Sequence, residues 1–193
     1  MTQEVRLTPD RQELMAELAR LSFEASQVAG PLDDAGFNWQ PNDGKEWSVG
    51  QCIEHLVRAN RLYLDALEEA ARAAIEKEGV GEPTPLVPGR LGRWFIDSIE
   101  PESGPKLNAP KKIVPPSYCM KMSTLVAFAG EQQRIIELVR DTAGIDCNSI
   151  KFKNPLAYGL RVFNLSTGLL VMTAHERRHL LQARRVVERM PPA

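Results

Sequence analysis

The chain has 193 residues, of which 43% are hydrophobic and 25% are charged. These values are close to the globular average, which excludes a disordered chain and fits a single domain over residues 1–193. The chain has 24 Lys and Arg residues and 25 Asp and Glu residues, so the positive and negative charges nearly balance. This balance excludes a strongly basic protein, and we expect no nucleic-acid partner.

Apolar runs and cysteines indicate the compartment. The wholly apolar runs are only a few residues long, so none could span a bilayer, and we expect no membrane partner. The first residues contain no apolar signal core. Cys52, Cys119 and Cys147 form no C-x-x-C pair and predict reduced thiols. We therefore expect a cytoplasmic protein.

The first predicted helix begins at Thr8-Pro9-Asp10, where Thr8 can cap the helix and Pro9 suits its first position. Gly30-Pro31 ends it. Between these signals, apolar residues recur at spacings of three and four and mark one buried face: Leu14, Leu18, Leu21, Ala25 and Val28. In the loop that follows, Phe37 and Trp39 are expected to pack against the helices.

A second helix is predicted from Ser48 to about Glu78. Ser48 and Gln51 match the capping box, in which each residue satisfies a backbone N–H of the other, and Trp47 and Cys52 stand where a hydrophobic staple would form. Residues at helical spacing then form an inward face: Cys52, His55, Leu56, Ala59, Leu62 and Ala66.

The helical spacing of apolar residues becomes weaker between residues 86 and 122. A short helix is predicted within Gly89 to Ile99, followed by a loop rich in Pro and Lys from Pro101 to Pro116. A connection this long can act as a crossover, which would let the helices before and after it run parallel.

Two more helices complete the prediction. The third runs from about Ser123 to Thr142, and the fourth from near Asn164 or Ser166 to about Arg189. The predicted fold is all-α, a four-helix bundle with a long crossover between its second and third helices.

Histidine placement points to a metal site. His175 and His179 are four residues apart, which in a helix turns the side chain by about 400° and puts both imidazoles on nearly the same face. His55, the third and last histidine of the chain, lies in the second predicted helix. We predict that all three bind one divalent transition metal, with Zn or Ni preferred over Fe or Mn. Three protein ligands leave a coordination position open, as in catalytic sites.

Two neighbouring residues have alternative interpretations. Cys52 could supply a fourth ligand and close the site, or it could be a buried apolar residue of the staple. Glu176 is the candidate catalytic residue, as a carboxylate beside the ligands or as a proton acceptor, and the alternative is a solvent-facing helix position.

The string His175-Glu176-x-x-His179 also matches H-E-x-x-H, the helix motif of zinc metalloproteases. Such an enzyme needs a third ligand, usually further along the chain, and a substrate-binding strand. No histidine follows His179, and Glu188 lies about 900° further round a continuous helix, on its opposite side. The sequence therefore favours a metalloprotease less than the other kinds of metal-dependent protein.

Four further motifs cover nearly the whole chain: Phe37-Asn38-Trp39-Gln40-Pro41, the run from Glu46 to Leu56, Ala109-Pro110-Lys111-Lys112, and the run from His175 to Gln182. In these motifs the chain resembles the DinB-like superfamily of metal-dependent enzymes. The resemblance implies an up-down-down-up four-helix bundle, a metal held by residues matching His55, His175 and His179, and a homodimer. Characterised members of the family include transferases for small thiols such as bacillithiol and a mycothiol-dependent maleylpyruvate isomerase, and many others are described as hydrolases.

These features give three hypotheses for function. The first, by analogy with the family, is an S-transferase that joins a low-molecular-weight thiol to a small electrophilic substrate. The second is a metal-dependent hydrolase, and the third is a non-catalytic, metal-stabilised binding or stress scaffold. Trp94, Tyr158 and Arg161 are candidates for substrate contact, although packing or surface roles are the simpler interpretation of each.

Overall fold

The computed structural model describes residues 7–101 and 109–191. Within these ranges the regular structure is helical, and the one β pairing is an isolated bridge between Lys151 and Asn164. The all-α prediction is confirmed. The long helices are α1 (Pro9–Ala29), α4 (Val49–Glu78), α6 (Lys121–Asp141) and α7 (Leu165–Glu188), and the short ones are α2 (Asp34–Asn38), α3 (Pro41–Gly44), α5 (Arg90–Ile99) and the 3-10 turn η1 (Lys111–Ile113).

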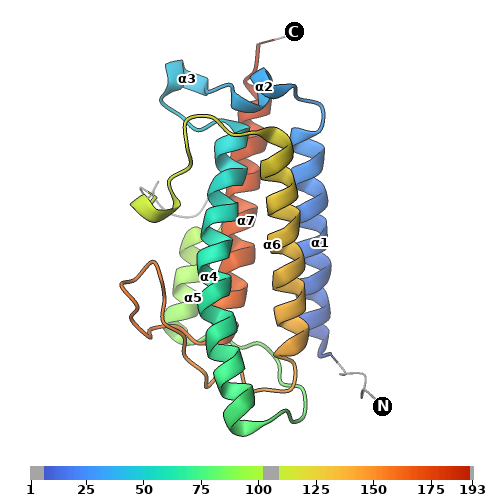
Figure 1. Cartoon of the computed structure of the whole chain (residues 1–193), viewed down its shortest axis with the longest axis vertical. Coiled ribbons are helices and arrows are strands. Elements are labelled where there is room, and N and C mark those ends of the chain that lie inside the picture. The colour runs from blue at the N-terminus through green and yellow to red at the C-terminus, as the bar shows by residue number, and fades with distance from the viewer. Residues whose placement is uncertain (1–6, 102–108, 192–193) are drawn as a thin grey trace.

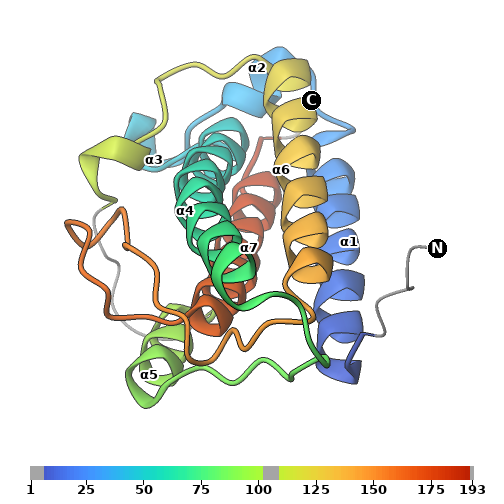
Figure 2. The ribbon, with the colours of Figure 1, turned by 60° about the horizontal axis from the view of Figure 1, so that its bottom comes forward.

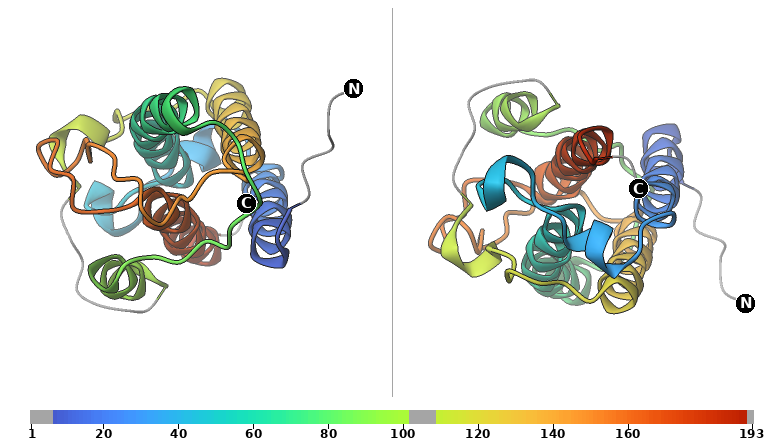
Figure 3. Two further views of the ribbon diagram at one scale, coloured as in Figure 1. Left: turned by 90° about the horizontal axis from the view of Figure 1, so that it is seen from below. Right: turned by 90° about the horizontal axis from the view of Figure 1, so that it is seen from above.

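The long helices pack side by side along the longest axis of the molecule (Figure 1). α4 lies against α6 and α7, and α1 lies against the same two helices from the other side, as the end-on views in Figure 3 show. In Figure 1, α1 and α7 run upward whereas α4 and α6 run downward. α4 and α7 are therefore antiparallel neighbours. No helix in the described ranges has both the length and the apolar character needed to cross a membrane.

Residues 79–120 connect the lower end of α4 to the upper end of α6 (Figure 1). This segment carries α5, which packs on α7, and η1, which contacts α4. The short helix predicted here is present as α5, but residues 102–108 of the predicted Pro- and Lys-rich loop lie outside the described residues. Figure 2 shows α5 and the connection between α6 and α7 at the end of the bundle where α7 begins.

Local signals place the helix ends. The capping box of α4 is formed as predicted: the Gln51 backbone N–H donates to Ser48 Oγ at 3.0 Å, and the Ser48 N–H donates to Gln51 Oε1 at 3.1 Å. Asn164 caps α7 by accepting from the Thr167 N–H. Thr8 stands at the N-cap of α1, but its side chain makes no capping hydrogen bond, in contrast to the prediction. α6 begins at Lys121, two residues before the predicted start.

The apolar core forms two clusters along the bundle. The cluster around the start of α4 contains the fully buried Phe37 and the partly buried Trp39, so the prediction that these aromatic residues pack against the helices is confirmed. Phe37 lies against Gly50, where an added Cβ would meet the ring at 2.8 Å. Glycine at this position therefore lets α2 approach α4 closely, in the half of the bundle that contains the histidines.

A fully buried arginine ties the opposite half together. Arg11 of α1 is 0% exposed, and no carboxylate pairs with it in the described part of the chain. Its guanidinium donates to the carbonyl oxygens of Thr84, Val139 and Thr142 at 2.8–3.1 Å, to Thr142 Oγ1 at 3.1 Å and to Cys147 Sγ at 3.3 Å. One side chain therefore fixes α1 to the end of α6 and to the segments that follow α4 and α6.

We expect Arg11→Met to lower the free energy of unfolding by about 3 kcal/mol, because several buried acceptors would lose their donor. Urea denaturation followed by circular dichroism measures this change. Arg20→Met, at an exposed position of the same helix, is the control and should change stability by less than about 1 kcal/mol. Equal losses in the two variants would contradict the structural role given to Arg11.

Candidate metal centre

The three histidines come together at the contact between α4 and α7. His55 lies nearly two turns beyond the start of α4, and His175 and His179 lie on successive turns of α7. One ring nitrogen from each histidine belongs to a group whose members all lie within 4.8 Å of one another, and His55 Nε2 is 3.1 Å from His175 Nε2. Ligand nitrogens around a tetrahedral Zn ion lie roughly 3.3 Å apart, given Zn–N bonds of about 2.0–2.1 Å. The His55–His175 pair is close to this spacing, and the group as a whole could hold a metal ion.

Hydrogen bonds on the far side of two rings orient their metal-facing nitrogens. His55 Nδ1 lies 2.8 Å from the carbonyl oxygen of Ile113 in η1, which can only accept, so this nitrogen carries the ring proton. His179 Nδ1 makes the equivalent contact with Gln182 Oε1 at 3.0 Å. In both residues this leaves the Nε2 lone pair for a cation. Metal-binding histidines are usually oriented by such partners.

Burial keeps the imidazoles neutral. It lowers the pKa of His55, lowers that of His175 well below its usual range, and lowers that of His179 to about 3. The neighbouring histidines and Arg178 add smaller effects in the same direction at His175 and His179, whereas the Ile113 hydrogen bond partly opposes the shift at His55. Neutral imidazoles are the form that binds metal, so protons compete weakly with an ion at neutral pH.

Trp47 forms an aromatic wall beside the ligands. Its ring centroid lies 4.8 Å from that of His55 and 5.8 Å from that of His179, with an angle of 29° between the Trp47 and His179 planes. The sequence assigned Trp47 only to the staple, because a residue before a helix cap gives no signal for a contact with α7. Gln182 was also missed, although its position three residues after His179 on one helix could have indicated it.

Glu176 points into the core of the bundle. The residue is 0% exposed, so the solvent-facing alternative is wrong. Its Oε1 accepts from Asn60 Nδ2 of α4 at 2.7 Å and from Gln132 Nε2 of α6 at 2.6 Å. Burial raises the pKa of Glu176 to about 7, and the two amide donors partly oppose this shift. The carboxyl group thus joins α7 to α4 and α6 behind His175.

The remaining candidates lie elsewhere. Cys52 is fully buried among apolar side chains and is not in the histidine group, and burial raises the pKa of its thiol, so it is a core residue. Trp94 is 65% exposed on α5, and Tyr158 is fully exposed. Arg161 lines a separate groove. In the described ranges no hydrogen bond or ring contact joins these three to the histidines.

Comparison with known proteins places the chain in a family. A family model described as the DinB superfamily matches residues 17–183, a range that includes all three histidines. The chain belongs to the DinB superfamily. No curated protein and no solved structure matches it. The tri-histidine group of this DinB-superfamily chain could thus hold a metal ion, by the closeness of its ring nitrogens and by its donor chemistry.

We expect the purified protein to bind about one equivalent of Zn or Ni, and His55→Ala or His175→Ala to lose most of it, since two imidazoles hold such ions far more weakly than three. Gln182→Ala should weaken the affinity about 10-fold by releasing the His179 ring. Elemental analysis and competition with a chelator measure both effects. Glu188→Ala, at an exposed position of α7, is the control. Full metal content in His175→Ala would refute the site.

Glu176→Leu should lower the free energy of unfolding by about 2–4 kcal/mol, because two buried amide groups lose their acceptor. In the Glu176→Leu background, Gln132→Leu should lower the free energy of unfolding much less than it does in the wild type. The reason is that the Gln132 amide has already lost its acceptor there. Urea titrations of the four proteins in this double-mutant cycle measure the coupling, with exposed Glu188→Leu as the control. Additive losses would show that the pair does not interact.

Proposed function

We propose that this DinB-superfamily protein is a metal-dependent enzyme that transfers a low-molecular-weight thiol to an electrophilic carbon of a small substrate. The observation that carries the proposal is the convergence of three neutral imidazoles without a fourth Cys, Asp or Glu ligand in the described group. Three nitrogen donors suit Zn or Ni, with Fe or Mn as further candidates. A bound ion of this type would lower the pKa of a coordinated thiol or water.

The chain's own residues prepare the site for this chemistry. Ile113 and Gln182 hold the His55 and His179 rings in the tautomer that presents Nε2. The Trp47 ring packs against two of the rings and gives the site an apolar wall on that side. The family resemblance implies small thiols as one class of substrate, and an open coordination position is what such a ligand needs. The directions of the long helices in Figure 1 support the up-down-down-up bundle that we propose as the scaffold.

The catalytic role of Glu176 is part of the proposal. Its Oε2 has no hydrogen-bond partner in the described part of the chain, so the carboxylate retains an acceptor position next in sequence to a metal ligand. Its contacts with Asn60 and Gln132 support a second contribution, which is to fix the rotation of α7 and so aim His175 and His179 at His55.

A metal-dependent hydrolase and a non-catalytic metal-stabilised scaffold are the alternatives. The H-E-x-x-H string favours the hydrolase, in which this glutamate is the general base that activates a metal-bound water. The Glu176 carboxylate instead bonds to core amides and is not in the histidine group, which favours thiol transfer. We also propose that the protein works in the cytoplasm, where its three free cysteines stay reduced, and that it forms a homodimer.

The Zn- or Ni-loaded protein should accelerate the reaction of small thiols with monochlorobimane at least about 100-fold over the uncatalysed rate, and His175→Ala should lose this acceleration. Fluorescence of the bimane adduct measures the rate. Cys119→Ser is the control for labelling of the protein itself and should retain activity. Hydrolysis of 4-nitrophenyl acetate without thiol transfer would favour the hydrolase. Stabilisation by metal without either activity would favour the scaffold.

A further inference from the structure

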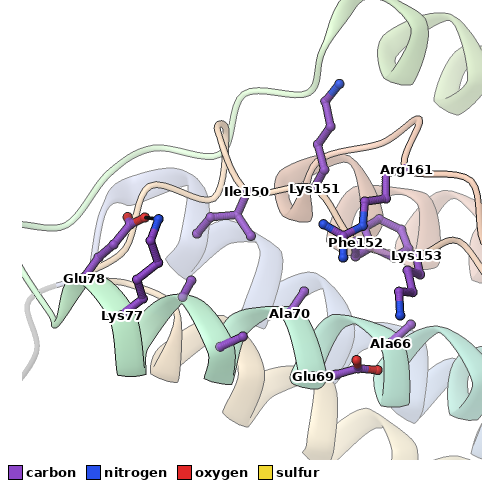
Figure 4. A pocket seen from close by; sticks show the side chains of 12 residues that line it. Ala66, Glu69, Ala70, Lys77, Glu78, Ile150, Lys151, Phe152, Lys153 and Arg161 are labelled. Carbon is purple, nitrogen blue, oxygen red and sulfur yellow. Dashed lines mark hydrogen bonds and ion pairs between the residues drawn. The ribbon is translucent and has the colours of Figure 1, made fainter.

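A cavity lies between the later half of α4 and the connection from α6 to α7 (Figure 4). We call it the α4 groove; its volume is about 300 Å³. The first α4 residue that lines it, Ala66, stands 11 positions after His55, or about 16 Å along the helix axis. The groove is therefore separate from the metal centre.

The floor of the groove is apolar and consists of small side chains. Ala66, Ala70 and Ala74 follow one another on a single face of α4, and their methyl groups leave room that larger side chains would fill. Phe152 and Ile150 form the opposite wall. Phe152 is buried, and its ring packs edge-on against another α4 residue at a centroid distance of 5.7 Å. The wall is thus held firmly to the helix.

A tight hairpin positions two cations above this floor. The Asn154 N–H donates to the Leu160 carbonyl at 3.1 Å and closes the neck of the hairpin. Asn154 is 3% exposed, and its Nδ2 donates to the hydroxyl of Tyr63 on α4 at 3.0 Å, which anchors the neck to the bundle. Lys153 and Arg161 are the residues immediately outside the neck and so lie side by side.

Both of these cations face the groove without a partner. Figure 4 shows Lys153 and Arg161 extending toward α4, whereas Lys151 points away from it. Neither has an ion pair or side-chain hydrogen bond among the described residues. Of the acidic residues that line the groove, Glu78 pairs with Lys77 at 3.3 Å, and Glu69 remains to face the two cations. The groove thus combines an apolar floor with an excess of positive charge.

We propose that the α4 groove binds a small organic anion, a carboxylate or phosphate attached to an apolar group. The anionic head would lie between Lys153 and Arg161, since guanidinium groups bind carboxylates and phosphates through paired hydrogen bonds. The apolar body would lie on the alanine floor. The volume is at the lower end for ligand sites, which restricts the ligand to a single ring or a short chain.

Phenyl phosphate is the probe, and titration calorimetry with alanine methyl NMR measures its binding. We expect the double variant Lys153→Gln/Arg161→Gln to weaken binding at least about tenfold, since it removes both charge-assisted contacts. Lys45→Gln/Arg140→Gln, at exposed positions elsewhere, is the charge-matched control and should leave the affinity unchanged. Ala70→Leu should abolish binding by filling the floor, whereas Ala16→Leu on the exposed face of α1 should not.

Inorganic phosphate and phenol separate the two parts of the ligand, and each should bind at least about tenfold more weakly than phenyl phosphate. The His175→Ala variant separates the groove from the metal centre and should bind the probe as the wild type does. Three results would overturn the proposal: no binding to the wild type, equal affinity in the Lys153→Gln/Arg161→Gln variant, or loss of binding in His175→Ala. Circular dichroism verifies that each variant is folded.

Discussion

The antiparallel contact between α4 and α7 is the constraint on which the candidate metal centre depends. His55 comes from one helix and the His175–His179 pair from the other, so a small rotation or slide of either helix would separate the ligand nitrogens. On the interior side of α7, the Glu176 carboxylate accepts from amides of both α4 and α6. Such a fully buried polar contact tolerates few alternative geometries, and it therefore fixes the rotation that aims the two histidines.

Segments outside the long helices complete the site. η1, which belongs to the crossover, supplies the carbonyl that orients His55, and the turn before α4 supplies Trp47. The crossover therefore does more than connect α4 to α6, because it reaches over α4 and fixes a ligand. A long structureless connection would increase the entropic cost of closing the loop and would return no packing energy. Here the described parts of the connection contact the bundle.

The bundle carries different chemistry at its two halves. Near the start of α4, three neutral imidazoles, one buried and two half-buried, could hold a cation. Near the end of α4, Lys153 and Arg161 border an apolar groove suited to an anion. The guanidinium of Arg11 is buried among neutral acceptors in this second half, where it ties α1 to the ends of its neighbours. Stability in that half comes from satisfied hydrogen bonds as well as apolar packing.

Local sequence patterns alone predicted the helices, the capping box at Ser48 and the placement of His175 and His179 on one helix face. Helical periodicity and caps act over a few residues, so the sequence carries these signals directly. The meeting of His55 with that pair, 120 residues away, was a hypothesis that the packing of α4 on α7 confirmed. The burial of Glu176 and the contact of Trp47 were decided only by the tertiary structure. Both depend on how helices rotate against one another, which is set by long-range packing and leaves no short-range signal.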